Sequence, residues 1–207
     1  MALRNRVTPF GEIVAIPERG TMMGNRGVLH NPQRTIVRDW QVRRWIACRL
    51  EFRGRHRQVM QPDRYTELFF LDEASALADG HRPCAECRID DYRAFQSIWR
   101  DVHSTQDASA DSMDRVLQSE RRSGPFAKRT FRASLASLPN GTYVEVDSRA
   151  WLVLDDALLA WSGDRYVDHV RRPGDRQVAV LTPLSIVEAL RRGYKPGLHP
   201  TAYSTFA

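Results

Sequence analysis

The sequence has few cysteines, almost no lysine and no long apolar run. Three cysteines in 207 residues are an odd number, which does not suit a framework of disulfides. No stretch of about 18 apolar residues is present, so we expect no transmembrane helix and no membrane partner. The first residues also have no apolar segment typical of a secretory signal. Together these absences predict a protein of the reducing cytoplasm.

The positive charge is carried almost entirely by arginine. Only Lys128 and Lys195 are lysines among the 31 basic residues, and the formal net charge is +6. Residues 1–64 have a net charge of +8 and residues 65–120 of −7, so the two ends of the chain are basic and the middle is acidic. Arginine suits bidentate contacts with phosphate and stacking on bases. Both a nucleic-acid-binding face and an ordinary charged surface fit this pattern.

The cysteines are spaced as in a metal site. Cys84 and Cys87 form a CxxC motif after Pro83, at the start of a predicted helix, and this spacing points two sulfurs at one ion. Cys48 is the only other cysteine, so a zinc site would need a fourth ligand of another type, most simply a histidine. The alternation of apolar residues around Cys48 also fits a buried thiol without a metal. Arg82, Arg88 and the helix start are expected to stabilise the thiolates.

Three histidines are candidates for the fourth ligand. His30 is the first choice because it ends a glycine-rich segment at residues 20–30, which we interpret as a connection, with a phosphate-wrapping loop as the alternative. His56 shares a face with Cys48 only if the turn before it has three residues. His81 ranks behind both.

Two segments of the chain resemble a known zinc domain. The stretches WIACRLEFRGRH and LDEASALADGHRPCAECR are similar to the Ada-type zinc-binding domain of bacterial methylphosphotriester DNA repair proteins, over residues 45–92. The resemblance places Cys48 on the first ligand, Cys84 and Cys87 on the last two, and Phe52 where the family has its remaining cysteine. It implies a zinc cofactor and DNA as the partner. In the family a zinc-bound thiolate of the first pair accepts the methyl group, which makes Cys48 a candidate alkyl acceptor.

Arginines close to these motifs are the candidates for contacts with nucleic acid. A basic and aromatic segment surrounds Cys48, and a second basic stretch spans residues 121–132. The candidates are Arg26, Arg43, Arg44, Arg53, Arg55, Arg57, Arg121, Arg122, Lys128 and Arg129.

The function that the sequence favours is a zinc-binding protein that contacts nucleic acid, with DNA favoured over RNA and the zinc mainly structural. Whether the chain is an enzyme stays open, since a zinc-dependent nuclease or an alkyl acceptor at Cys48 also fits. A deaminase is disfavoured because no histidine is followed two residues later by glutamate. A redox role for the CxxC motif lacks a βαβ context. A zinc-stabilised protein-interaction module is the remaining alternative.

The periodicity predicts an α+β fold, with N-terminal β-hairpins and helices around an Ada-like zinc site. Strands are expected at 12–16, 35–41 and 44–52, and helices at 73–78, 85–100 and 111–122. Five short strands and one helix that begins near Pro183 predict a small antiparallel unit at the C-terminus. We therefore expect a zinc module at 1–102, a helical and basic connector at 103–137 and a β-rich domain at 138–207.

Overall fold

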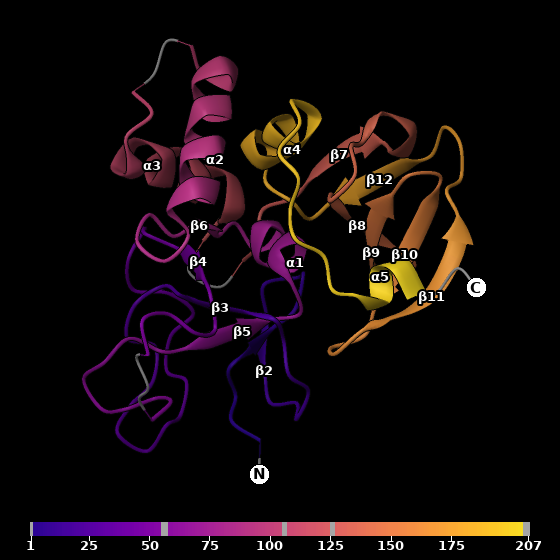
Figure 1. Cartoon of the computed structure of the whole chain (residues 1–207). Helices are drawn as coiled ribbons and strands as arrows, with labels where there is room; N and C mark the ends of the chain where they lie inside the picture. The colour runs from indigo at the N-terminus through magenta and orange to yellow at the C-terminus, as the bar shows by residue number, and fades with distance from the viewer. Residues whose placement is uncertain (1, 55–57, 105–106, 125–126, 205–207) are drawn as a thin grey trace.

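The chain is an α+β protein built on two sheets of six strands each. The computed structural model describes residues 2–54, 58–104, 107–124 and 127–204. Figure 1 shows the first sheet and helices α2 and α3 on one side, the second sheet on the other, and helix α1 between them. Among the described helices none has the length and apolar character that crossing a bilayer requires.

The first sheet has the strand order β2-β1-β5-β3-β4-β6 and is mixed. The pairs β1·β5 and β4·β6 are parallel, while β1·β2, β3·β5 and β3·β4 are antiparallel. Its strands are β1 (Arg6–Val7), β2 (Ile13–Val14), β3 (Met22–Asn25), β4 (Ile46–Cys48), β5 (Leu68–Phe70) and β6 (Arg82–Pro83).

The second sheet is antiparallel, with the order β11-β10-β9-β8-β12-β7. It contains β7 (Phe131–Ser134), β8 (Tyr143–Val146), β9 (Arg149–Leu154), β10 (Ala157–Trp161), β11 (Tyr166–Arg171) and β12 (Gln177–Val180). The five predicted strands beyond residue 138 are confirmed. The sheet also gains β7, which belongs to the stretch that we expected to be a connector.

Five helices and one short 3-10 turn are found in the described parts of the chain. They are α1 (Glu73–Ala78), α2 (Ile89–Val102), α3 (Ala110–Arg121), α4 (Leu184–Arg191), α5 (Thr201–Ser204) and the turn at Leu135–Ser137. Helix α1 begins where the sequence predicts it: the Asp72 carboxylate accepts from the Ser75 N–H, and the Ser75 hydroxyl oxygen accepts from the Asp72 N–H. Its end is followed by Gly80 at φ +89°.

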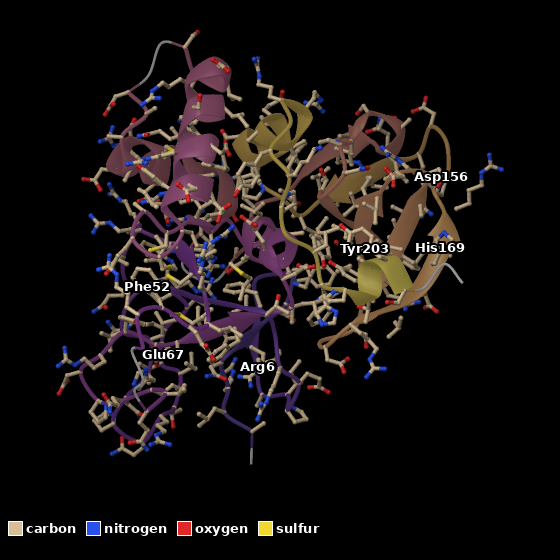
Figure 2. All side chains as sticks on the ribbon, viewed as in Figure 1. Arg6, Phe52, Glu67, Asp156, His169 and Tyr203 are labelled. Carbon is tan, nitrogen blue, oxygen red and sulfur yellow. The ribbon has the colours of Figure 1, made fainter. Side chains whose placement is uncertain are left out.

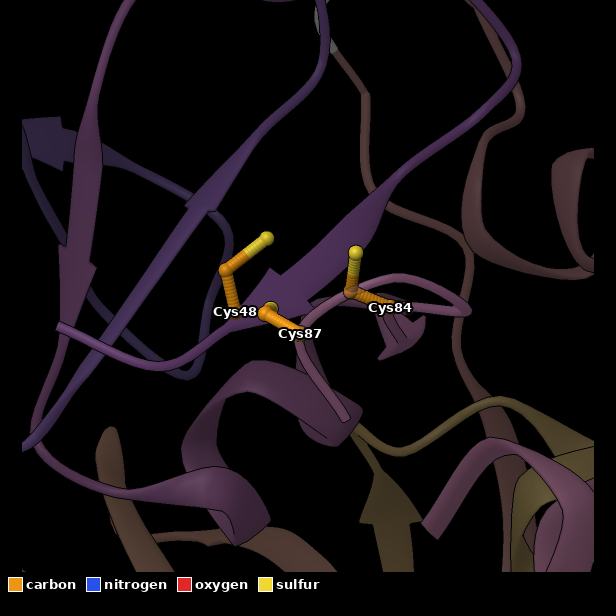
Figure 3. Close-up of side chains that lie close together, drawn as sticks. All are labelled: Cys48, Cys84 and Cys87. Atoms are coloured by element: carbon orange, nitrogen blue, oxygen red, sulfur yellow. The ribbon is translucent and has the colours of Figure 1, made fainter. Parts of the chain in front are cut away.

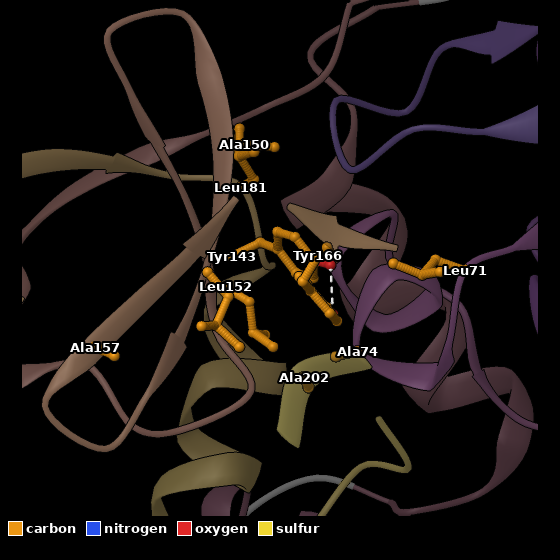
Figure 4. Packing of buried hydrophobic residues seen from close by; sticks show 11 residues of the cluster. Leu71, Ala74, Tyr143, Ala150, Leu152, Ala157, Tyr166, Leu181 and Ala202 are labelled. Atoms are coloured by element: carbon orange, nitrogen blue, oxygen red, sulfur yellow. Dashed lines mark hydrogen bonds between the residues drawn. The ribbon is translucent and has the colours of Figure 1, made fainter. Parts of the chain in front are cut away.

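Helix α1 is the centre of the molecule. All six of its residues are buried, and Ala74 and Ala78 belong to one core cluster with Tyr143 and Tyr166 of the second sheet. Figure 4 shows Ala74 and the two tyrosines in this cluster. Alanine at these positions lets both sheets approach the helix closely. Because this cluster draws on the regions 1–102 and 138–207 together, the two predicted domains share a core.

Strand β11 and the C-terminal tail fix the start of α1 through hydrogen bonds. The Tyr166 hydroxyl donates to Asp72 Oδ2 at 2.7 Å, and the His199 N–H donates to the same oxygen at 3.0 Å. The Tyr194 hydroxyl donates to Glu73 Oε1 at 2.6 Å. Such partners compensate the cost of burying two carboxylates next to a helix start, where negative charge is also favoured by the helix dipole.

Two predicted strands near the first sheet are wrong or shorter than expected. Residues 35–41 form no strand, and only an isolated bridge joins His30 and Ile36. The predicted strand 44–52 is reduced to the three residues of β4, and Leu50 beyond it is 49% exposed. The pairing of β4 ends with Cys48 opposite Met23 of β3 and with Ala47 opposite Pro83 of β6.

Candidate metal centre

Strand pairing brings Cys48 and the CxxC motif together. Strand β4 lies between β3 and β6, and its parallel pairing with β6 sets Ala47 opposite Pro83. The Cys84 N–H donates to the Ala47 carbonyl at 3.0 Å, so Cys84 leaves the sheet beside Cys48. A tight turn follows, closed by a hydrogen bond from the Arg88 N–H to the Cys84 carbonyl at 3.1 Å. This turn swings Cys87 back towards the other two sulfurs.

The three sulfurs lie within 4.8 Å of one another, as Figure 3 shows. Cys48 and Cys84 are buried, with 7% and 6% exposure, and Cys87 is half-buried. Tetrahedral zinc holds sulfur at about 2.3 Å, which places two sulfurs roughly 3.8 Å apart. The distances between the sulfurs would therefore have to shorten by no more than about 1 Å for the three cysteines to hold such an ion. The residues present can bind a metal.

The backbone around the site donates hydrogen bonds to sulfur. The Glu86 N–H donates to Cys84 Sγ at 3.4 Å, and the Arg49 N–H donates to Cys87. Hydrogen bonds from the Cys48 and Cys87 thiols lower the pKa of Cys84, whereas the pKa of Cys48 is raised by its hydrogen bond with Cys84 and by burial. A bound cation would favour the thiolate at all three positions.

Arg82 and Arg88, which flank the cysteines, form ion pairs with carboxylates. Arg82 makes two hydrogen bonds to Asp114, at 3.0 and 2.8 Å. Arg88 pairs with Glu73 at 2.8 Å and with Asp91 at 2.9 Å. We expected Arg82 and Arg88 to stabilise the thiolates, but both guanidinium groups pair with carboxylates instead. These ion pairs instead attach the segment before and after the cysteines to α3 and α1.

The structure does not place His30 or His81 with the sulfurs. His30 forms hydrogen bonds through both ring nitrogens, to the Thr66 hydroxyl at 2.6 Å and to the Gln61 carbonyl at 3.1 Å. His81 packs against Phe70 on the opposite face of the first sheet from Cys48. Among the described residues no histidine joins the cysteine group. His56 lies outside the described residues.

A cleft of about 500 Å³ opens beside the three cysteines. Its floor is one face of the first sheet, where Met23 of β3 lies opposite both Cys48 and Phe69. Asn25 is the next residue of β3 on this face and pairs with Ile46. The remaining lining residues are Arg49, Leu50, Phe52, Val59, Tyr65, Glu67, Glu86 and the other two cysteines. Figure 2 shows Phe52 and Glu67 on this side of the molecule.

Three of the arginines predicted to contact nucleic acid are buried, and that prediction is wrong for them. Arg26, Arg121 and Arg122 are 0%, 1% and 8% exposed. Their guanidinium carbons lie 4.4, 3.9 and 5.4 Å from the ring centre of Trp45, which is itself fully buried. An aromatic face attracts cations strongly once water is excluded. These basic residues around a tryptophan therefore form a contact inside the protein core and not a surface for nucleic acid.

This buried group, formed by Trp45 and its three arginines, is balanced by carboxylates and carbonyls. Arg26 pairs with Asp79 at 3.0 Å and Arg122 with Asp39 at 3.1 Å. Arg121 donates to the Gly80 carbonyl at 2.7 Å. The group fixes the chain after α3 onto the first sheet, which explains why the stretch 121–132 is not a free connector.

The other basic candidates differ in exposure. Lys128 is half-buried and donates to the Ala78 carbonyl at 2.7 Å, and burial lowers its pKa to about 8. Arg43, Arg44, Arg53 and Arg129 are exposed. Arg55 and Arg57 lie outside the described residues.

Asn25 and Glu67 of the cleft were not identified from the sequence. Strand β3 was not predicted, because its segment contains glycines, which are typical of a connection between two elements. Those glycines are required by close packing: a Cβ on Gly20 would lie 1.7 Å from the Phe70 carbonyl oxygen, and one on Gly24 would lie 2.6 Å from the Ile46 carbonyl oxygen.

Comparisons with known proteins give no match: no family model fits the chain, and no curated protein or solved structure resembles it significantly.

Proposed function

We propose that the chain is a zinc protein in which Cys48, Cys84 and Cys87 hold one zinc ion. The observation that supports this most directly is the convergence of three sulfurs within 4.8 Å from segments that are far apart in the sequence. Thiolates select soft or borderline ions, and an all-sulfur group of this size suits tetrahedral zinc. The ion would join β4 to the start of α2, so it would stabilise the fold of this region.

The order of the ligands is that of the Ada-type zinc domain, and we propose the same kind of centre with one sulfur missing. Phe52, which stands where that family has its remaining cysteine, lines the cleft beside the three sulfurs. The fourth coordination position would then face the cleft, next to this apolar ring. A water molecule, a substrate atom or a histidine outside the described residues would fill it.

Purified protein is expected to contain about one zinc ion per chain. Cys48→Ser, Cys84→Ser and Cys87→Ser should each lower the zinc content, because a hydroxyl replaces a thiolate ligand. His30→Gln is the matched control and should keep its zinc, since both ring nitrogens of His30 are already hydrogen-bonded. The measurement is elemental analysis, together with zinc release from the native protein by a thiol-modifying reagent. Reduced protein that takes up no zinc would contradict the proposal.

We further propose that exposed arginines in the segment around Cys48 contact the phosphates of nucleic acid. Arg43, Arg49 and Arg53 are exposed and belong to the segment that contains Cys48. The Arg53 guanidinium carbon lies 4.9 Å from the ring centre of Phe52, so a cation and an aromatic face are presented together. This combination suits a single strand, whose backbone meets the arginines and whose bases stack.

Salt dependence tests this part of the proposal. Removing two phosphate contacts by Arg43→Gln/Arg53→Gln should make the slope of log affinity against log salt shallower by about 1.4 for a single strand. The control Arg171→Gln/Arg192→Gln removes two exposed arginines from β11 and from the end of α4, and it should leave the slope unchanged. Fluorescence anisotropy with labelled oligonucleotides measures both. Equal slopes for the two double variants would remove the arginines near Cys48 from the interface.

A further inference from the structure

The cleft beside the cysteines has the size and lining of a small-ligand site. Its volume of about 500 Å³ falls within the range typical of such sites, about 300–1,000 Å³. Its lining combines apolar and aromatic side chains with the polar side chains of Asn25, Arg49, Glu67 and Glu86. Ligand sites generally combine an apolar lining with a small number of polar groups that fix the orientation of the ligand.

Asn25 is the polar group that the fold leaves available. Its side chain lines the floor of the cleft, and Asn25 pairs with Ile46 of β4, while the preceding residue, Gly24, pairs with Leu68 of β5. No described residue makes a hydrogen bond with the Asn25 amide, although each neighbouring strand is paired through its backbone. The amide presents two donors and an acceptor side by side. A planar ligand with a complementary edge fits this group.

Aromatic rings surround the amide. Phe52, Tyr65 and Phe69 line the same cleft, and Met23 adds a polarisable surface between Phe69 and Cys48. Stacking on aromatic side chains is the main way in which proteins hold an unpaired base. An asparagine amide pairs with adenine through two hydrogen bonds, to its amino group and a ring nitrogen. The lining therefore matches an adenine base more closely than an aliphatic ligand.

Exposed charged side chains lie at the edge of the cleft, and they are two arginines and one glutamate, Glu86. Arg49 is exposed and lines the cleft, and Arg53 lies over Phe52 at its edge. A base that enters the cleft would leave its phosphates next to these guanidinium groups, which suit phosphate oxygens. We propose that the cleft binds one unpaired nucleobase, preferably adenine, whose polar edge is recognised by Asn25. This inference rests on the proposed contact with nucleic acid and names the part of the strand that is recognised.

The test compares bases and backbone separately. Zinc-loaded wild-type protein is titrated with a short oligodeoxyadenosine strand and with an abasic strand of the same length. Loss of the bases should weaken binding roughly 5- to 100-fold. Asn25→Leu is similar in volume and should reduce the preference for adenine over thymine to within about twofold, while the salt slope stays that of the wild type. The control Gln58→Leu changes an exposed amide and should keep the preference.

Each other outcome has a definite meaning. Equal, salt-dependent binding of both strands would overturn the base site and leave the phosphate contacts in place. If neither strand binds, the proposed contact with nucleic acid fails, and adenosine monophosphate then tests the cleft alone by calorimetry. Binding of this nucleotide to wild type but not to Asn25→Leu would support the base site, and absence of binding to both would overturn it.

Discussion

The buried ion pair between Arg82 and Asp114 gives the strongest prediction about stability. Arg82 precedes Pro83 and Cys84 in the cysteine motif, and it reaches α3 through two hydrogen bonds at 3.0 and 2.8 Å. Both side chains are almost fully buried, at 2% and 3% exposure. Arg82→Met would leave the Asp114 carboxylate buried without its partner. Breaking a buried pair in this way costs about 3–5 kcal/mol.

A loss of this size is easy to measure. For a chain of this length about 1 kcal/mol shifts the melting temperature by roughly 2–4 °C, so the variant should melt roughly 6–20 °C lower. Thermal and urea unfolding of the zinc-loaded protein, followed by circular dichroism, give the change in the free energy of unfolding. The double variant Arg82→Met/Asp114→Leu should recover much of the loss, because no unpaired charge remains.

The matched control is the same substitution in an exposed pair. Arg176 and Asp147 form an ion pair at 3.2 Å with 49% and 80% exposure. Exposed pairs contribute about 0–1 kcal/mol, so Arg176→Met should change stability little. If Arg82→Met were as mild as this control, the explanation of how the cysteine motif is anchored would be refuted.

Two further predictions concern buried polar groups. Burial lowers the pKa of His81 to about 4, so the folded protein resists a proton that the unfolded chain binds near pH 6.5, and stability falls by about 3 kcal/mol as the pH drops from 6.5 to 4. The difference in unfolding free energy between His81→Phe and wild type should vary with pH over this window, and a constant difference would contradict the assignment. Tyr166→Phe removes a donor to Asp72 and should cost about 1–3 kcal/mol in urea unfolding. Tyr203→Phe, at an exposed position, should cost almost nothing, and equal effects of the two would show that the buried bond does not stabilise the link between the sheets.

The parts of the fold that depend on local signals could be predicted from the sequence. Asp72, Ser75 and Gly80 mark both ends of α1 through capping and a left-handed turn, which act within a few residues. The C-terminal strands alternate regularly between turn signals, and five of them were predicted. The convergence of Cys48 with the CxxC motif was also expected, from ligand counting and from the resemblance to the Ada-type domain.

The features that depend on tertiary packing could not be predicted in the same way. Gly20 before β3 and Gly24 within it permit close backbone approach, yet in the sequence they are typical of turns. The basic cluster of Arg26, Arg121 and Arg122 is indistinguishable by composition from a phosphate-binding surface, because only the fold shows that Trp45 and two carboxylates surround it. Asn25 lies in the cleft because β3 pairs with β4, a strand that is distant in the sequence.

The measurement that tests the central claim most directly is X-ray absorption at the zinc edge of the purified, reduced protein. The account predicts zinc bound by three sulfur atoms at about 2.3 Å and one lighter ligand at about 2.0 Å, with the sulfur signal reduced in Cys84→Ser. A spectrum with only nitrogen and oxygen neighbours, unchanged by that substitution, would show that Cys48, Cys84 and Cys87 converge without holding the metal.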